Sequence, residues 1–415
     1  MMNYVIVGNS TAAIGTVEGI RSVDTKGTIT LISDESYHTY SRPLISYYLS
    51  GKIPESKMYS RPKDYYERLA IIPRLGSRVS SIRLEEKTVV LESGENIPYD
   101  RLMLATGGKP IVPPMSGRDL KGVHTFIKWD DALGLGKVLK SGNRIVVIGA
   151  GITGLKAAEA LIKCGVEVII VELASRVLSE LLDETAAALV QRTLENHGIK
   201  FYLRSKVTEI LGARGRVSGV CLNNETTIKC EQVVIALGVS PNTDLVRDTE
   251  IRVNRGILVD EHMATSVVDV YAAGDVAEGY DTLYRERRVL PILPNAYKQG
   301  FNAGVNMTGK VQSFGGSFAM NSIGFFDLPM ITAGIVMPEG EGFSELIDTT
   351  SSKSYRKVVL REDRIVGYIA LNKVDRAGMM VGLMEKEVDV GDLLEHLFEG
   401  DFDHVSFSKE FRQEQ

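Results

Sequence analysis

The chain has 415 residues, which at about 100 to 200 residues per domain allows two to four domains. Apolar residues make up 44 % and charged residues 24 %, an ordinary globular composition that argues against disorder, collagen-like repeats and coiled coil. The net charge of −5 disfavours a nucleic-acid or anionic-membrane partner, because both require a basic surface. No apolar run approaches the roughly 18 residues of a membrane span, and nothing targets the chain outward, so we expect a cytoplasmic protein.

The predicted elements alternate between strands and helices, and one strand–turn–helix pattern occurs twice. It spans residues 3–20 and again residues 144–161, where a β-branched run ends in a glycine-rich turn that opens an amphipathic helix. Each copy closes with a second buried strand, at 28–35 and 166–172, about 23 to 26 residues after its first glycine. An acidic group at that distance can reach a ribose. The duplication predicts an α/β fold with two Rossmann-like dinucleotide-binding domains.

The rest of the chain is read in order as segments around these copies. Before the second copy come a tyrosine-rich polar stretch (37–68), a β-rich stretch (77–105) and a proline-containing link (109–114). After it come a β-meander (about 201–237), the motif VYAAGDVAEG (270–279) and, from about 310 onward, a run of strands with a helical tail.

The second glycine turn, GAGITG, is a complete G-x-G-x-x-G. Its first glycine makes the tight turn, its second lets the backbone approach a pyrophosphate, and its third allows close packing of helix on strand. The helix N-terminus adds free N–H groups and a positive dipole end. Glu172 ends the next strand, where a carboxylate accepts from a ribose 2′-OH and would repel a 2′-phosphate, which predicts preference for NADH over NADPH. The expected dinucleotide-binding residues of the turn are Gly149, Gly151, Ile152, Thr153 and Gly154.

The first glycine turn is degenerate. Gly8 holds the turn, but Ser10 and Ala13 stand where the other two glycines would be. Both replacements are small, so the pocket can still admit a pyrophosphate, with the Ser10 hydroxyl or N–H as an extra donor and Thr11 and Ala12 opening the helix. LMLATGGKP (102–110) and VYAAGDVAEG (270–279) stand at the distances expected if the chain leaves this domain and returns to it.

Taken together, five motifs resemble those of the pyridine nucleotide-disulfide oxidoreductase family. They are the two glycine turns, ATGG at 105–108, GVSPN at 238–242 and AAGD at 272–275. The resemblance runs from about residue 3 to about residue 400, and is nearest to the rubredoxin reductase-like and nitrite reductase-like NADH oxidoreductases. It implies an FAD domain at 1–110 and 241–309, an NAD(H) domain at 111–240, and a C-terminal α+β interface domain at 310–415.

The resemblance also implies roles for single residues. Asp275 would reach the ribityl and pyrophosphate region of a noncovalent FAD, and Arg42, in YSRP, matches the family's arginine close to the flavin. Asp34 would meet the adenosine ribose, with Glu35 as the alternative because the register is uncertain by one. Further cofactor-binding candidates from the motifs are Ala105, Thr106, Gly107, Gly238 and Gly274.

The chain departs from the family in its sulfur chemistry. Disulfide reductases of this fold carry a cysteine pair in the helix after the first acidic loop, and peroxidase-like relatives carry one cysteine there. Here that stretch reads SRPLISYYLSG (41–51) and has none, which predicts that no thiol relay operates. We interpret Cys164, Cys221 and Cys230 as reduced thiols in the core or at the surface, and the lack of a metal-spaced Cys/His cluster predicts no metal site.

A second departure concerns the reactive edge of the flavin. Many relatives place a glutamate two residues after the third glycine of the NAD turn, paired with a lysine on a first-domain helix. The corresponding residues here are Lys156 and Tyr47. We therefore expect the cation at Lys156, where an ammonium could stabilise negative charge on reduced flavin. The alternative is a lysine that lies along the helix with its charge in water.

The charges are unevenly distributed along the sequence. Residues 42–78 contain eight basic and three acidic side chains, so that this segment carries +5 and the remainder −10. Together with YRERR (284–288) it could form a docking face for an acidic iron–sulfur carrier, such as a ferredoxin or rubredoxin, or for an iron–sulfur subunit of a larger redox complex. The alternative is an ordinary solvated basic surface.

These patterns and the resemblance predict an FAD-dependent NADH oxidoreductase. Flavin would exchange hydride with nicotinamide and single electrons with a protein carrier, in a direction that the sequence does not reveal. One alternative is an NADH oxidase or peroxidase that uses oxygen species, which the missing cysteine disfavours, and another is a non-catalytic NADH-binding redox sensor. The identity of the partner, a homodimeric state and the role of the C-terminal domain are left open.

Overall fold

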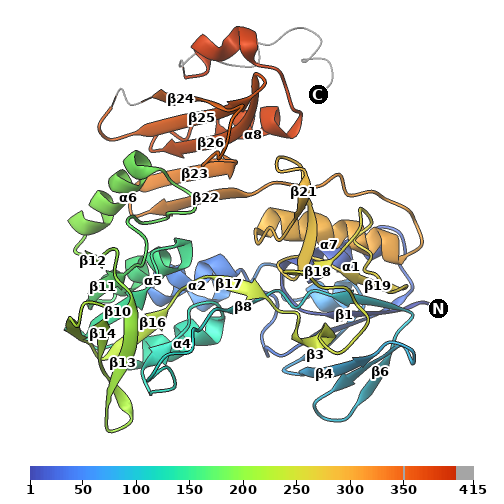
Figure 1. Ribbon diagram of the computed structural model, residues 1–415. Helices are drawn as coiled ribbons and strands as arrows, with labels where there is room; N and C mark the ends of the chain where they lie inside the picture. The colour runs from blue at the N-terminus through green and yellow to red at the C-terminus, as the bar shows by residue number, and fades with distance from the viewer. Residues whose placement is uncertain (349–350, 399–415) are drawn as a thin grey trace. The chain divides into compact units, whose positions relative to one another are not determined.

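The computed structural model describes residues 1–348 and 351–398 (Figure 1). Contacts group the chain into two compact units, one of Met1–Leu173 with Ile199–Ala319 and one of Ala174–Gly198 with the chain from Met320 onward. Residues 399–415, the end of the predicted C-terminal domain, lie outside the described residues. Within the described part of the chain, no helix is long and apolar enough to cross a membrane.

The first glycine turn follows the central strand of a five-stranded sheet with the order β19–β7–β1–β2–β3. Every neighbouring pair is parallel. The last four residues of β1 are all buried, as is typical of parallel strands covered on both faces. The strands are β1 (Asn3–Val7), β2 (Thr28–Ser33), β3 (Ile71–Leu75), β7 (Arg101–Leu104) and β19 (Val270–Ala272).

The second glycine turn occupies the same place in a second parallel sheet, with the order β12–β11–β10–β16–β9. Val7 pairs with Ile32 in the first sheet and Ile148 with Val171 in the second, in each case one residue before the glycine. The duplication seen in the sequence is therefore a duplication of structure, and the predicted α/β fold with two Rossmann-like sheets is confirmed. The strands are β9 (Val123–His124), β10 (Arg144–Ile148), β11 (Glu167–Val171), β12 (Lys200–Tyr202) and β16 (Gln232–Ile235).

A two-stranded ribbon connects these sheets. The outgoing strand β8 (Gly108–Pro110) pairs antiparallel with the returning strand β17 (Val239–Pro241). The Thr106 hydroxyl donates to the carbonyl oxygen of Asn242 at 2.7 Å, which adds a hydrogen bond between the outgoing and the returning segment. The helices of this unit are α1 (Thr11–Arg21), α2 (Ile45–Leu49), α3 (Tyr65–Arg68), α4 (Trp129–Val138), α5 (Ile152–Lys163) and α7 (Leu293–Met307).

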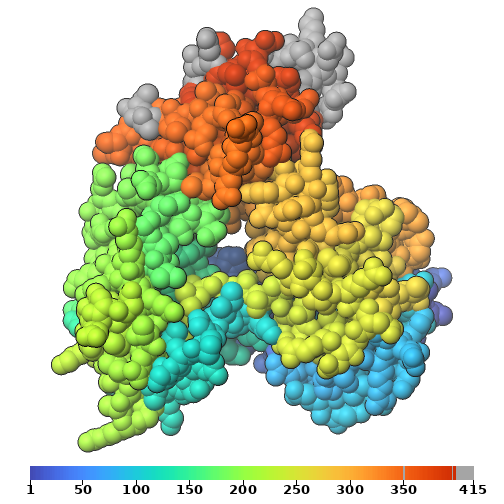
Figure 2. Space-filling model, in the orientation of Figure 1, coloured from blue at the N-terminus to red at the C-terminus, as the bar shows by residue number. Residues whose placement is uncertain are grey.

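Three small sheets complete the first unit. The hairpin between β13 and β14 ends in an exposed tip, Arg214 to Arg216, which Figure 2 shows protruding at the surface. The small sheets are β4 (Val79–Arg83), β5 (Thr88–Leu91) and β6 (Asn96–Pro98); β13 (Val207–Ala213), β14 (Arg216–Leu222) and β15 (Thr227–Lys229); and β18 (Ile257–Leu258), β20 (Ala277–Asp281) and β21 (Glu286–Arg288).

The second unit is an antiparallel sheet that carries two helices. Asp183 caps α6 by accepting from the Ala186 N–H at 3.0 Å, and its other oxygen accepts from the Tyr355 hydroxyl at 2.5 Å. His197 stacks on Phe326 with ring centroids 3.7 Å apart. The elements, in sheet order and then helices, are β22 (Met320–Phe325), β23 (Leu328–Gly334), β26 (Arg364–Leu371), β25 (Tyr355–Arg361), β24 (Ser344–Asp348), α6 (Glu184–Asn196) and α8 (Ala377–Glu385).

Helix α6 lies within residues 111–240, the range predicted for the NAD domain, yet its contacts group it with the C-terminal sheet. These contacts join residues about 170 positions apart in sequence, which strand and helix periodicity does not report. The domain boundaries read from the sequence therefore stay a prediction.

Helices α1 and α7 lie side by side and touch backbone to backbone (Figure 1). A β-carbon on Gly300 would lie 2.1 Å from the carbonyl oxygen of Ala12, and one on Gly304 would lie 2.2 Å from that of Thr16. On the other helix, a β-carbon on Gly15 would lie 2.4 Å from the carbonyl oxygen of Tyr297. Only glycine fits at these contacts, which explains part of the high glycine content.

We expect Gly304→Ala to destabilise the first unit by about 1–3 kcal/mol, because the added methyl group overlaps the Thr16 carbonyl and forces the helices apart. The matched control is Gly134→Ala in α4, where a β-carbon meets nothing within 4 Å. Alanine's better helix propensity should leave that variant unchanged or up to about 1 kcal/mol more stable. Thermal unfolding followed by circular dichroism compares the two, and equal midpoints would contradict the tight packing.

Candidate functional site

The first glycine turn is shaped by contact with the strand that leaves the sheet. Gly8 has φ of +132°, and a β-carbon on it would lie 2.2 Å from the carbonyl oxygen of Ala105. Ser10 is the N-cap of α1, but its side chain makes no capping hydrogen bond, so the N–H groups of the first turn, from Thr11 onward, have no side-chain acceptor there. Such a turn is a ready site for an anion such as a pyrophosphate.

Two helix N-termini converge beside the AAGD motif. A β-carbon on Gly274 would lie 3.0 Å from the Ala12 methyl of α1 and 3.5 Å from the Ala296 methyl of α7. Helix α7 also starts without a side-chain cap. Near this end, the Asn295 side chain is 1 % exposed and its carbonyl oxygen has no hydrogen-bond partner within the described residues. A buried polar atom and two uncapped helix ends leave this region suited to a large polar ligand.

Arg42 lies in a polar network beside the same motif. Its guanidinium pairs with Glu35 at 2.5 Å, and the Tyr40 hydroxyl donates to the other Glu35 oxygen at 2.6 Å. Burial works to lower the pKa of Arg42, but Tyr40, Glu35 and, more weakly, Asp275 raise it overall. Burial raises the pKa of Asp275, against the charge of Arg42. The structure thus brings together the predicted Arg42 and Asp275.

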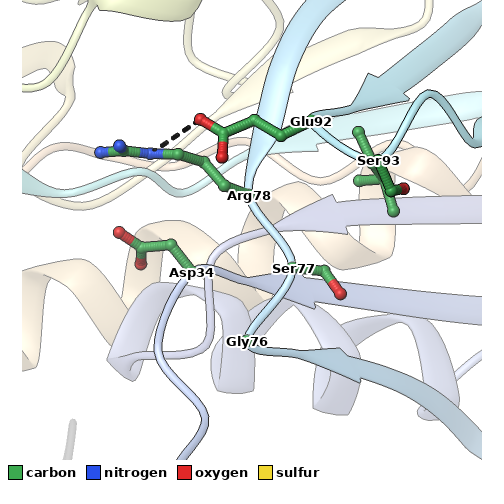
Figure 3. A pocket seen from close by; sticks show the side chains of 7 residues that line it. Asp34, Gly76, Ser77, Arg78, Glu92 and Ser93 are labelled. Carbon is green, nitrogen blue, oxygen red and sulfur yellow. Dashed lines mark ion pairs between the residues drawn. The ribbon is translucent and has the colours of Figure 1, made fainter.

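A cavity of about 400 Å³ opens beside Asp34 at the end of β2. Figure 3 shows the side chains of Asp34 and Arg78 extending in the same direction, with Arg78 paired to Glu92 at 3.9 Å. Burial works to raise the pKa of Asp34, but the hydrogen bond and charge of Lys128, 2.9 Å away, hold it below its usual value. Both carboxylates are paired, but Asp34 is 40 % exposed and lines the cavity whereas Glu35 is 8 % exposed. Asp34 therefore stays the predicted ribose ligand, ahead of Glu35.

The second glycine turn repeats the geometry of the first. A β-carbon on Gly149 would lie 2.5 Å from the carbonyl oxygen of Ala236, and one on Gly154 would lie 2.0 Å from that of Gly149. A β-carbon on Gly151, by contrast, would meet nothing within 4 Å. The middle glycine therefore faces open space, as a backbone that admits a pyrophosphate must.

The other predicted residues of the nucleotide turns lie around these glycines. The Glu172 carboxylate accepts from the Ala150 N–H at 2.7 Å, so it stands directly at the second turn. Ile152 and Thr153 open α5. Gly107 comes directly before β8 and Gly238 directly before β17, the two strands that connect the sheets. Their φ angles are +67° and +88°, and a β-carbon on either would meet nothing within 4 Å.

Lys156 lies one turn into α5 and is buried, with a side chain 11 % exposed. Its ammonium lies 4.7 Å from the ring centroid of Tyr47 on α2, so the two positions aligned from the sequence are in contact. The alternative of a solvated helix lysine is therefore wrong. The sequence reading missed that Lys156 pairs with Glu159, which also binds Lys163 at 2.8 Å, although the i, i+3 spacing was visible.

The three cysteines are free thiols. Burial raises the pKa of Cys164, and burial together with the nearby Glu231 charge raises that of Cys230 to about 12. Cys164 touches α2 at the Leu49 carbonyl, but it lies eight residues beyond Lys156, about 12 Å along the helix. Thiols with raised pKa values are weak nucleophiles, which agrees with their interpretation as structural residues.

An aromatic cluster supports the Arg42 network and was not predicted. Trp129 is 1 % exposed and lies 4.9–5.7 Å, between ring centroids, from four tyrosines. Its backbone N–H donates to the Tyr40 hydroxyl at 3.0 Å. The tyrosine-rich stretch was visible in the sequence, but its tryptophan partner comes from a distant segment. The four tyrosines are Tyr37, Tyr40, Tyr48 and Tyr59.

These two turns, with the open middle glycine of the second and a carboxylate after the following strand of each, correspond to a known family of proteins. The family model for pyridine nucleotide-disulphide oxidoreductases matches residues 2–300. The chain belongs to this family. It is therefore an FAD-dependent NADH oxidoreductase with FAD and NAD(H) as cofactors, as the sequence predicted.

Several characterised relatives of this oxidoreductase are similar over most of its length. The epsilon subunit of NADH-dependent phenylglyoxylate dehydrogenase from Aromatoleum evansii is 30 % identical over 94 % of this chain and 93 % of its own. Rubredoxin-NAD(+) reductase from Pseudomonas putida is 32 % identical over 72 % of this chain and 78 % of its own. A crystal structure of a ferredoxin reductase from Rhodopseudomonas palustris matches with a TM-score of 0.85 at 26 % identity, covering 94 % of this chain and 96 % of its own. The chain spans about half the length of two longer relatives.

The residues of this oxidoreductase fit both cofactors. The uncapped starts of α1 and α7 and the unpartnered Asn295 oxygen suit FAD on the first sheet. The open space at Gly151 and the Glu172 carboxylate suit NAD(H) on the second. These residues are therefore candidates for binding FAD and NAD(H).

We expect the oxidoreductase to prefer NADH, and Glu172→Gln to reduce the ratio of kcat/KM for NADH to that for NADPH by about tenfold or more. The amide no longer repels a 2′-phosphate but still accepts from the Ala150 N–H. The control is Glu167→Gln, which changes an exposed carboxylate at the start of the same strand. Steady-state kinetics measures kcat/KM with both nucleotides. Equal kcat/KM values for NADH and NADPH in the unaltered enzyme would show that Glu172 does not distinguish the two riboses.

We also expect simultaneous replacement of Cys164, Cys221 and Cys230 by alanine to leave the rate of flavin reduction by NADH nearly unchanged. All three are free thiols and two have raised pKa values. Stability should fall mainly through Cys230, which is 1 % exposed. Anaerobic stopped-flow spectroscopy measures the rate. A loss of more than about tenfold in a folded variant would reveal a thiol relay.

Proposed function

We propose that this enzyme exchanges electrons between NADH and an iron–sulfur protein through FAD, without a redox disulfide. The observation that carries the proposal is the contact between α2 and α5, which joins the two nucleotide-binding sheets. There the family's thiol position lies in the sulfur-free segment 41–51, and the contact is made by Tyr47 and Lys156. Cys164 touches α2 at the Leu49 carbonyl, but burial raises its pKa, and segment 41–51 itself offers no thiol. Reduced flavin then has no disulfide beside it and passes its electrons to another acceptor.

Bound flavin couples two-electron exchange with NADH to single-electron exchange with an iron–sulfur centre. The chain's own residues bind and orient the reactants. The turn from Gly149 to Gly154 takes the NADH pyrophosphate, Glu172 accepts from its ribose, and the turn at Gly8 with Asp34 takes the corresponding parts of FAD. Lys156 supplies a positive charge where the two cofactors meet.

The names of the relatives support an iron–sulfur partner of either kind. One relative is called a rubredoxin reductase and another a ferredoxin reductase, which points to a small diffusing carrier. A third is a subunit of an NADH-dependent dehydrogenase, which points to electron transfer to another subunit of a complex. We place the FAD domain at 1–110 and 241–309, the NAD domain at 111–240, and the interface domain from 310.

The basic segment 42–78 is a weaker docking surface than its net charge indicates. Half of its eight basic side chains form ion pairs with carboxylates outside the segment, which cancels much of its charge. The pairs are Arg42–Glu35, Arg61–Glu18, Arg74–Glu95 and Arg78–Glu92.

The β20–β21 hairpin is the better candidate for carrier docking. Arg285 and Arg287 are exposed, Tyr284 is 43 % exposed, and Figure 2 shows this segment, in gold, at the surface. The hairpin is held rigid because the buried Asp281 accepts from the N–H groups of Leu283 and Tyr284 at 3.0 and 3.1 Å. Exposed arginine and tyrosine on a rigid turn are typical of protein-binding sites.

We expect the double variant Arg285→Glu, Arg287→Glu to lower kcat/KM for an acidic ferredoxin or rubredoxin by about tenfold or more at low salt, because it reverses the charge that steers association. Reduction of the small acceptor ferricyanide by NADH should be unchanged. The matched control is Arg214→Glu, Arg216→Glu at the exposed tip of the β13–β14 hairpin.

Two outcomes would contradict this part of the proposal. Equal losses in both double variants would mean that the hairpin is not the docking site. Failure to reduce any iron–sulfur protein, with rapid consumption of oxygen instead, would identify an NADH oxidase.

A further inference from the structure

A cluster of charges surrounds the half-buried Tyr47, where α2 meets α5, with Lys156 and Glu159 buried and Lys52 exposed. The Lys156 ammonium lies 4.7 Å from the ring centroid on one side, and the Lys52 ammonium lies 4.8 Å from it. Behind Lys156, Glu159 is 6 % exposed and pairs with both Lys156 and Lys163. One buried carboxylate therefore serves two ammonium groups, of which Lys163 is the more exposed at 37 %.

This arrangement meets a physical requirement. An ammonium that is 11 % exposed loses most of its hydration, and that loss is offset only by an opposite charge or strong hydrogen bonds nearby. Burial works to raise the pKa of Glu159, but hydrogen bonds from Lys156 and Lys163, together with their charges, hold it below its usual value. Glu159 is thus ionised at neutral pH and supplies that opposite charge.

We propose that Glu159 is a positioning residue that holds the Lys156 ammonium against Tyr47 and thereby sets how strongly that ammonium favours reduction of the flavin. The inference rests on the proposed function, which puts Lys156 at the meeting point of the two cofactors. The carboxylate acts in two ways. It fixes where the ammonium lies, and it partly neutralises the charge that the flavin experiences.

A purely structural role for Glu159 predicts a different result from this positioning role. Removal of the Glu159 charge should raise the flavin midpoint potential and removal of the Lys156 charge should lower it, because each charge acts on the flavin directly. If that direct effect were all, Glu159→Gln would give the same shift whether Lys156 is present or replaced. If the carboxylate acts by holding the ammonium, most of its effect disappears when Lys156 is replaced, so the two substitutions should not be additive.

The experiment is a spectroelectrochemical titration of FAD-loaded full-length variants. Glu159→Gln should shift the reduction equilibrium upward by about tenfold, which is about 30 mV for a two-electron couple, and Lys156→Met should shift it downward by a similar factor. In the Lys156→Met background, Glu159→Gln should shift it less than about threefold, because the group through which it acts is gone. The matched control is Lys163→Met, which removes the more exposed partner of the same carboxylate and should leave the midpoint in place.

The outcomes separate this inference from the proposed function. An unchanged midpoint in Lys156→Met would mean that Lys156 does not act on the flavin, and this inference would fail, whereas the proposed function fails only if no iron–sulfur protein is reduced. A lowered midpoint in Lys156→Met with no shift in Glu159→Gln, or with the same shift in both backgrounds, would overturn only the positioning role. If Glu159→Gln does not fold, Glu159→Asp replaces it, since the shorter side chain keeps the charge but moves the ammonium, and a midpoint equal to that of the unaltered enzyme would overturn the proposal.

Discussion

Contact between backbone segments at the two glycine turns is the constraint on which the rest of the structure depends. A β-carbon on Gly8 or Gly149 would lie within 2.2 or 2.5 Å of a carbonyl oxygen in the neighbouring crossover. Each contact presses the turn after the central strand against the point where the chain leaves the sheet. The helix that follows therefore begins at the edge where all the parallel strands end, with its N–H groups facing outward. Both dinucleotide sites are built in this way, and the glycine contacts between α1 and α7 add a second helix start to the first of them.

Pairing of charges across segments decides what each site can do electrostatically. Glu35 pairs with Arg42 and Tyr40 away from the cavity, Asp34 lines the cavity and pairs with Lys128, and Glu159 pairs with Lys156 and Lys163. The same pairing cancels much of the basic charge between residues 42 and 78, whereas the exposed arginines of the β20–β21 hairpin keep theirs. Net charge along a sequence is therefore a poor guide to the field at a surface, because a partner from another segment can neutralise it.

The chemistry of this enzyme follows from a substitution at one interface. Where thiol-dependent members of the family place sulfur next to the flavin, segment 41–51 here has none, and at the position aligned with the family's lysine α2 presents Tyr47, whose ring contacts the ammonium of Lys156. An aromatic ring and a buried, carboxylate-held ammonium can tune the energy of a flavin but cannot form a covalent intermediate with a substrate. Under the proposed function, electrons that enter from NADH leave through the redox centre of an iron–sulfur partner and not through a disulfide.

The sequence by itself determined the α/β class, the two dinucleotide turns, the acidic residues at the strand ends and the absence of sulfur from residues 41–51. All of these depend on residues close together in the chain, where strand and helix periods and glycine spacing are directly readable. Only the tertiary structure decided that Asp34 rather than Glu35 faces the cavity, that Trp129 lies among four tyrosines, and that α6 packs with the C-terminal sheet. These depend on contacts between segments far apart in sequence, and on burial that changes the cost of each charge, neither of which a local pattern records.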